Sequence, residues 1–238
     1  MSSKSALRLF RIGGMDVKIH LTFFLLPLAV GFIYYNAYGF LIGLRAVSLL
    51  LLVFLCVLAH EFSHGLRAKS LGIAVSDITL YPMGGVATMH RIPRQPRLEF
   101  SISIVGPLFN FALALILLPI LTALFGKENM LSPSLDSWPQ TLANLFWANI
   151  ALGVFNLVPA FPMDGGRILR SLLARRMNFE KATRISVYLG TIFAILFGLI
   201  GLWKRHWTLI LIAIFITHSA WREDHQSRHE ALLKEPEA

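Results

Sequence analysis

The sequence predicts an all-α integral membrane protein: a bundle of about six transmembrane helices with a short membrane-associated β-hairpin or re-entrant loop after the second helix. Two observations support this prediction. Hydrophobic residues make up 55% of the 238-residue chain, charged residues make up 15%, and the mean hydropathy is +0.63. In addition, apolar stretches long enough to cross a bilayer alternate with short polar segments. Soluble domains do not have this composition.

The first predicted span covers residues 19–40 and follows a basic segment, residues 1–18, with two Arg and two Lys. A secretory signal peptide is the alternative interpretation of this start. The apolar run is longer than the core of a signal peptide, and no small-residue cleavage site follows it. We therefore expect a retained span, although Gly31, Asn36 and Gly39 interrupt it.

The second predicted span covers residues 45–67 and ends in a cluster of polar side chains. Residues 70–98 follow, and they contain too many Gly, Pro and polar residues to cross a membrane. Within this segment, residues 73–80 and 86–89 are β-prone, and residues 81–85 read Tyr-Pro-Met-Gly-Gly. We therefore expect a short hairpin that turns at residues 81–85.

Four further spans are predicted in the rest of the chain. The third span begins with Gly106 and Pro107, and the proline should kink the helix or mark its first turn. The fourth contains Asn144, Asn149 and Asn156, which we expect to face protein or a wet cavity instead of lipid. The four predicted spans are residues 100–125, 141–158, 185–203 and 207–221, with a polar loop at residues 126–140 and a short basic amphipathic helix at residues 168–176.

These elements predict a single transmembrane domain over residues 1–222 and a polar cytoplasmic tail over residues 223–238. The positive-inside rule gives the orientation. With the N-terminus inside, the inner segments carry eighteen Lys and Arg residues and the outer segments carry four. We therefore expect an even number of spans with both termini in the cytoplasm. The net charge of +9 is spread over these short clusters, so it indicates topology and not nucleic-acid binding.

The polar cluster of the second span is His60-Glu61-Phe62-Ser63-His64, directly after the apolar run at residues 46–59. Positions four apart share one helix face, so both imidazoles can bind one metal ion. In this HExxH pattern the two His hold zinc and the Glu is the general base. A charge at membrane depth costs about 2.5–3.5 kcal/mol, and a metal would explain its presence. The alternative is a helix-end cluster of His and Glu that lies among the lipid headgroups or whose side chains are paired to each other. Cys56, the single cysteine, excludes an intrachain disulfide and is interpreted as a small buried residue.

A catalytic zinc site needs about three protein ligands, and Asp164 is the candidate for the third. In the predicted topology the second and fourth spans both run inward, so Glu61 and Asp164 reach a similar depth. Pro159 and Pro162 break the end of the fourth span, and the Gly-Gly pair after Asp164 allows a close backbone approach. Alternatively, Asp164 caps the helix that follows it. Because an HExxH motif is expected at the same depth, we favour the ligand.

These motifs resemble the site-2 protease family of intramembrane zinc metalloproteases. The resemblance rests on the HExxH motif at residues 60–64 and on residues 156–166, which are similar to the Asn-Pro-Asp-Gly motif of that family. It extends to the Pro-Met-Gly-Gly turn at residues 82–85 and to a Gly-Pro and Asn signature at residues 103–110. Together the motifs cover residues 54–167. Met163 stands where Leu is commoner in the family.

The resemblance implies a minimal zinc endopeptidase, without PDZ or CBS modules, in a prokaryotic inner membrane. It implies hydrolysis of a peptide bond in or near the transmembrane segment of a single-span membrane protein, as in regulated intramembrane proteolysis. One zinc ion per chain would be bound by His60, His64 and Asp164, and Glu61 would activate the attacking water. Asn156 is the candidate for stabilising the oxyanion, and its alternative role is a hydrogen bond between helices.

Two other classes of protein can be weighed against this interpretation. A membrane metal-ion transporter or metal-binding protein needs ligands spaced along several helices across the bilayer, whereas the candidate ligands here gather near one face. A membrane di-iron oxygenase needs several His clusters, and the other six His residues are scattered singly or lie in the tail. The zinc protease remains the favoured interpretation, and the sequence indicates no oligomeric state.

Overall fold

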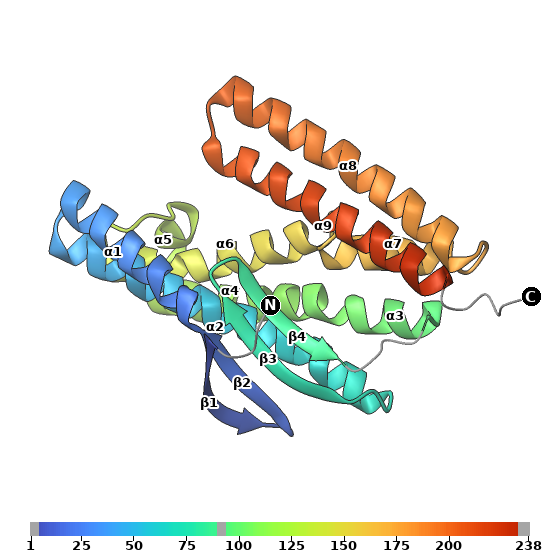
Figure 1. Cartoon of the computed structure of the whole chain (residues 1–238). Coiled ribbons are helices and arrows are strands. Elements are labelled where there is room, and N and C mark those ends of the chain that lie inside the picture. The colour runs from blue at the N-terminus through green and yellow to red at the C-terminus, as the bar shows by residue number, and fades with distance from the viewer. Residues whose placement is uncertain (1–4, 90–93, 233–238) are drawn as a thin grey trace, which may run out of the picture. The chain divides into compact units, whose positions relative to one another are not determined.

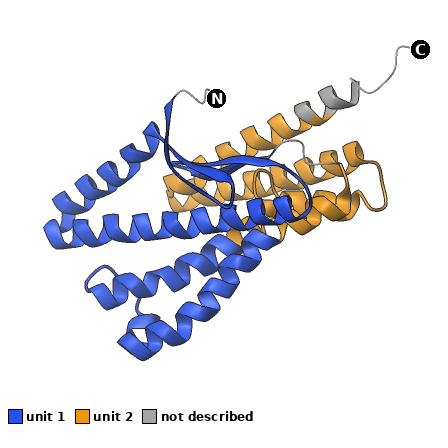
Figure 2. Ribbon diagram, turned by 90° about the horizontal axis from the view of Figure 1, so that it is seen from below, with its two compact units in different colours: residues 1–91, 105–153 blue, residues 92–104, 154–238 orange. Residues whose placement is uncertain are grey.

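The computed structural model describes residues 5–89 and 94–232. It divides into two compact units, which Figure 2 distinguishes by colour. Unit 1 comprises Met1–Arg91 and Val105–Gly153, and unit 2 comprises Ile92–Ile104 and Val154–Ala238. The elements, labelled in Figure 1, are β1 (Ala6–Ile12), β2 (Met15–His20), η2 (Leu21–Phe24), α1 (Leu25–Tyr38), α2 (Phe40–Ser70), β3 (Val75–Tyr81), β4 (Gly84–Met89), α3 (Pro96–Ser103), α4 (Val105–Phe125), α5 (Lys127–Leu131), α6 (Trp138–Asn156), α7 (Asp164–Leu173), α8 (Phe179–Lys204) and α9 (Trp207–Leu232).

Unit 1 contains a four-stranded sheet, so the prediction of an all-α protein was wrong in this respect. The strand order is β1-β2-β3-β4 (Figure 1). The outer pairs, β1 with β2 and β3 with β4, are antiparallel, whereas β2 and β3 are parallel. Parallel neighbours need a long crossover connection, and η2, α1 and α2 supply it.

The unpredicted hairpin β1–β2 depends on a Gly-Gly turn. Gly13 and Gly14 have φ values of +56° and +74°, and a two-residue hairpin turn requires such left-handed backbone. After the turn, the side chains of Met15 and Val17 are fully buried, and the residues between and after them are not. This alternation is that of a strand with one buried face. The Gly-Gly pair, which lies among basic residues, is the sequence signal for this turn.

The hairpin expected after the second helix corresponds to β3–β4. Its register pairs the last residue of β3 with the first residue of β4, so Pro82 and Met83 form the turn. This turn lies inside the predicted residues 81–85. Leu80 of β3 packs with Phe54 of α2 in a buried apolar cluster, which holds the hairpin against the helix. Its association with the membrane stays a prediction.

Four helical segments are long and apolar enough to cross a membrane, and many of their apolar side chains are exposed, as contact with lipid requires. The chain is therefore a multi-pass membrane protein. The predicted spans at residues 141–158 and 207–221 correspond to α6 and α9, which do not meet the same test over the described residues. The four segments are Leu21–Tyr38, Phe40–Ser70, Pro96–Phe125 and Phe179–Lys204.

Several predicted boundaries are corrected. The third span is broken at Ile104, which separates α3 from α4. Pro107 explains the break, because its ring clashes with the carbonyl group of Ser103, four residues earlier, in a continuous helix. The other corrections are that α5 lies in the predicted loop at residues 126–140, that the amphipathic helix begins at Asp164 and not at residue 168, and that α9 continues into the predicted tail as far as Leu232.

Unit 2 contains a buried ion cluster that joins α3, α7 and α9. Nε of Arg170 donates to Oε1 of Glu99 at 3.0 Å, and the same guanidinium donates to Glu223. The guanidinium also lies over the rings of Phe161 and Phe179, 4.9 and 4.7 Å from their centroids. Burial lowers the pKa of Arg170, but the two carboxylates raise this pKa above its usual value on balance. The cluster therefore fixes α7 with its arginine charged.

Replacing Arg170 with Met should destabilise the protein, because Glu99, which is only 3% exposed, would lose its cation. We expect the free energy of unfolding to fall by about 3–5 kcal/mol. Unfolding of the detergent-solubilised protein measures this, and Arg175→Met is the matched control because Arg175 is exposed and stacks on Phe100. Adding Glu99→Met to Arg170→Met should restore part of the stability. Equal losses for Arg170→Met and Arg175→Met would contradict the assignment.

Candidate metal centre

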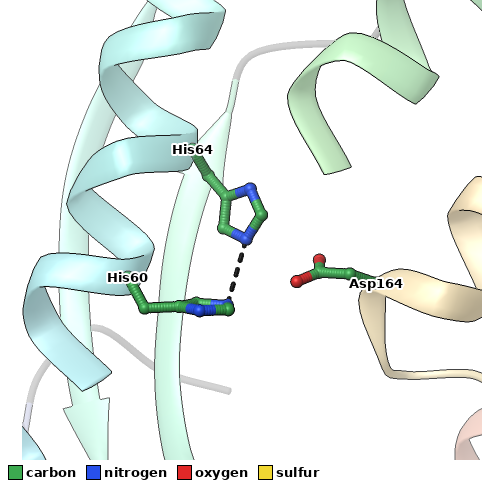
Figure 3. A group of neighbouring side chains, drawn as sticks. All are labelled: His60, His64 and Asp164. Carbon is green, nitrogen blue, oxygen red and sulfur yellow. Dashed lines mark hydrogen bonds between the residues drawn. The ribbon is translucent and has the colours of Figure 1, made fainter. Parts of the chain in front are cut away.

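His60 and His64 lie one turn apart on α2, and their side chains are buried, 4% and 5% exposed. Figure 3 shows the two imidazoles turned toward each other. Their Nε2 atoms lie 3.2 Å apart. The helix explains this geometry, because residues four apart share one face. The structure thus brings the two histidines together as their spacing predicts.

The separation of the two Nε2 atoms fits a tetrahedral zinc site. With zinc–nitrogen bonds of about 2.0–2.1 Å and tetrahedral angles, two His nitrogens lie roughly 3.3 Å apart. The observed 3.2 Å is close to this value, and it also permits an N–H···N hydrogen bond between the rings when no metal is bound. Two buried imidazoles that share one face therefore offer two of the ligands that zinc prefers.

Gly106 allows α4 to approach these imidazoles closely. A Cβ atom at this position would lie 2.2 Å from Nε2 of His64 and 2.6 Å from Cε1 of His60. Any larger residue would therefore displace both rings or occupy the space beside their nitrogens. The sequence placed Gly106 in a Gly-Pro signature, but this contact with the histidines was not predicted.

Glu61 is half-buried and packs against the start of β4. A Cβ atom on Gly85 would lie 2.6 Å from Cγ of Glu61, so the strand backbone reaches the stem of this side chain. Incomplete burial suits a general base, because the carboxylate must exchange protons with water and substrate. The Gly-Gly pair of this hairpin was recognisable in the sequence, but its contact with Glu61 through Gly85 was not predicted.

Two buried asparagines near His60 were not assigned to the site from the sequence. Nδ1 of His60 is hydrogen-bonded to Oδ1 of Asn110 in α4. Nδ2 of Asn110 donates to Oδ1 of Asn149 in α6 at 2.9 Å. Both amides are fully buried. The expectation that Asn149 faces protein is confirmed, while Asn110 had been noted only as part of the family signature.

Asp164 is the first residue of α7 in unit 2, and Figure 3 shows its carboxylate projecting from the first turn of that helix. Met163 occupies the N-cap position, so Asp164 is not the cap. The following Gly165 is required by close packing, because a Cβ there would lie 2.3 Å from the carbonyl oxygens of residues 157 and 158. Asn156 is half-buried and ends α6. The assignment of Asp164 and Asn156 to one site with the His pair stays a prediction.

Gly106→Ala should reduce metal binding by about tenfold or more, because the added methyl group would displace the two imidazoles from their common face. Zinc titration of the purified protein in detergent measures this loss. Gly198→Ala is the matched control, since its Cβ would lie 3.6 Å from Cβ of Ala213, an ordinary contact. Zinc affinities that agree between the two variants would contradict the close approach of α4.

Comparison with known proteins covers most of the chain. A family model described as Peptidase family M50 matches residues 48–134 and 132–197. A zinc metalloprotease of Methanocaldococcus jannaschii is 36% identical in an alignment of 236 residues that covers 96% of this chain and 63% of that protein. Stage IV sporulation protein FB of Bacillus subtilis is 28% identical over 207 residues, which are 86% of this chain and 62% of that protein. The chain thus spans less than two thirds of the length of these relatives.

A solved structure is also similar. The site-2 protease from Methanocaldococcus jannaschii superposes with a TM-score of 0.67 and 34% sequence identity, over 92% of this chain and 95% of the solved chain. The family match includes both the HExxH motif and the segment that contains Asp164. The resemblance to site-2 proteases expected from the motifs is thereby confirmed, and the chain belongs to peptidase family M50.

Proposed function

We propose that this protein is an intramembrane zinc metalloprotease that hydrolyses a peptide bond in or near the transmembrane segment of a membrane protein. The observation that carries the proposal is the buried pair His60 and His64, whose Nε2 atoms lie 3.2 Å apart on the apolar helix α2. Polar side chains are costly in such a helix and are usually functional. Membership of peptidase family M50 supports the same chemistry.

The proposed cofactor is one zinc ion per chain, bound by His60, His64 and Asp164. Two imidazoles and one carboxylate are a known ligand set of catalytic zinc, and they leave a fourth position for water. When bound, the ion would supply Lewis acidity, which would lower the pKa of a water ligand toward ~7 and polarise a peptide carbonyl group. Asp164 is supported by its place at the start of α7, where the helix dipole favours a negative charge.

Glu61 is the proposed general base and acid. Its carboxylate accepts a proton from the attacking water and later donates that proton to the nitrogen of the leaving amine. The side-chain amide of Asn156 donates a hydrogen bond to the oxyanion that develops on the scissile carbonyl group. A helical substrate must unwind before cleavage, and β4, whose Gly85 packs against Glu61, can hold an extended segment along its edge.

The proposed topology has six spans, formed by α1, α2, α3 with α4, α6, α8 and α9. The proposed location is the inner membrane of the cell, with both termini in the cytoplasm. The distribution of eighteen Lys and Arg residues inside against four outside supports it. Residues 1–222 form the proposed membrane-embedded domain, and α9 continues beyond them to Leu232, with Glu223 paired to Arg170. The proposed substrate is a protein with a single membrane span.

Glu61→Gln should keep zinc and lower cleavage by roughly 10²–10⁴-fold, because the amide cannot accept the proton of the attacking water. Proteomics can compare membrane-protein fragments between cells that produce the wild-type protein and cells that produce the variant. The difference would identify the substrate and measure the loss of cleavage. Glu128→Gln, on the exposed surface of α5, is the control. Undiminished cleavage by Glu61→Gln would refute the assigned role. If the wild-type protein cleaved no substrate and Glu61→Gln still transported metal, the result would favour a transporter.

His60→Ala and Asp164→Ala should each lower zinc content, because each removes one of three proposed ligands. Metal analysis of the purified variants measures this, with His206→Ala as a control on an exposed His directly before α9. If either alanine variant retained a full equivalent of zinc with wild-type affinity, that residue would not be a ligand.

A further inference from the structure

Unit 1 contains a continuous chain of buried polar side chains that starts at His60. It runs from α2 to Asn110 of α4, to Asn149 of α6, and back to Cys56 of α2. The two amides are 0% exposed and His60 is 4% exposed. Polar groups buried this deeply in an apolar bundle are retained only with partners, because each unmade hydrogen bond costs about 1–3 kcal/mol.

The direction of this chain is fixed at its far end by the backbone. Asn149 lies 2.8 Å from the carbonyl oxygen of Leu145, and a carbonyl oxygen can only accept a hydrogen bond. The atom of Asn149 that faces Leu145 is therefore the amide nitrogen, Nδ2. Its second N–H group points to Sγ of Cys56 at 3.4 Å. If the amide were turned over, two acceptor oxygens would face each other with no proton between them.

The orientation of Asn149 then determines that of Asn110. With both N–H groups of Asn149 engaged, its Oδ1 faces Asn110 and accepts from Nδ2 of that residue at 2.9 Å. Asn110 must in turn present its own Oδ1 to Nδ1 of His60. This oxygen has no proton to give. The proton of the hydrogen bond therefore belongs to His60, on Nδ1.

We propose that Asn110 and Asn149 are positioning residues that hold His60 in its Nδ1–H tautomer, so that the lone pair on Nε2 faces His64 and the metal. The inference rests on the metal site proposed above. A neutral imidazole can bind a metal through either nitrogen, and the hydrogen bond at the other nitrogen selects which. The ligand atom of His60 is accordingly Nε2, and the ring is oriented before the metal binds.

Variants at position 110 that keep a hydrogen-bond acceptor should bind zinc more tightly than variants whose side chain only fills the space. In Asn110→Leu the acceptor for Nδ1–H is lost, and we expect zinc affinity to fall by about 10–100-fold. Asn110→Asp keeps an acceptor oxygen toward His60, but its second oxygen would face Oδ1 of Asn149, so it should retain more affinity than Asn110→Leu and less than the wild type. Asn149→Leu removes the group that orients Asn110, and its zinc affinity should lie between those of Asn110→Leu and Asn110→Asp. Asn144→Leu is the matched control, because Asn144 lies on the same helix and donates to the carbonyl oxygens of Ser134 and Gln140.

The tautomer of His60 is a second measurement, because a change in packing alone would not change which ring nitrogen carries the proton. In the full-length protein with ¹⁵N-labelled histidine, the His60 signals are identified by their loss in His60→Ala. Nδ1 should be protonated and Nε2 unprotonated in the wild type without metal, and zinc should shift Nε2. Asn110→Leu should show a mixture of tautomers. A wild-type His60 protonated on Nε2, or wild-type zinc affinity in Asn110→Leu, would overturn the inference.

The outcomes distinguish this inference from the proposed function. Loss of zinc in His60→Ala together with unchanged affinity in Asn110→Leu and Asn149→Leu would leave the metal site standing and remove the positioning role. Retention of zinc in His60→Ala would remove both. If Asn110→Leu does not fold, the comparison of Asn110→Asp and Asn149→Leu with Asn144→Leu still tests the order of affinities, and equal affinities in all three would overturn the inference.

Discussion

Burying two imidazoles on an apolar helix is the constraint on which the rest of unit 1 depends. Each ring has two nitrogens, and neither can be left without a partner where water is scarce. The Nε2 atoms of His60 and His64 face each other, and α4 meets this pair with Gly106 and Asn110, which are also four residues apart. One turn of α4 therefore supplies both the space beside the rings and the acceptor for Nδ1 of His60.

The neighbouring face of α2 packs against the sheet instead of against α4. Glu61 and Gly65, again four apart, turn toward the sheet: Glu61 packs against Gly85, and a Cβ on Gly65 would lie 2.6 Å from Sδ of Met15. The helix thus presents its histidines to another helix and its glutamate to a strand. Because Glu61 directly follows His60, about 100° further around the helix, the sheet holds the proposed general base beside the two histidines. The unpredicted strand β2 contributes Met15 to this packing.

Unit 2 shows a comparable dependence of α7 on buried charge. Arg170 is held by Glu99 and Glu223 from two other helices, and removing Arg170 would leave two carboxylates without their shared cation. The first turn of α7 is packed so closely against the preceding loop that Gly165 has no room for a side chain. Asp164 is thereby placed on a rigid helix start, as a proposed metal ligand should be.

The sequence by itself determined what depends on local periodicity: the apolar helices, the hairpin β3–β4, and the convergence of His60 and His64, since residues four apart share a helix face wherever the helix packs. The tertiary structure decided the rest. Asn110 meets His60 across 50 positions, Asn149 meets Asn110 across 39, and β2 pairs with β3 across the whole of α1 and α2. Such contacts depend on which faces of distant elements pack together, and that choice reflects the free energy of the complete fold, which no short segment contains.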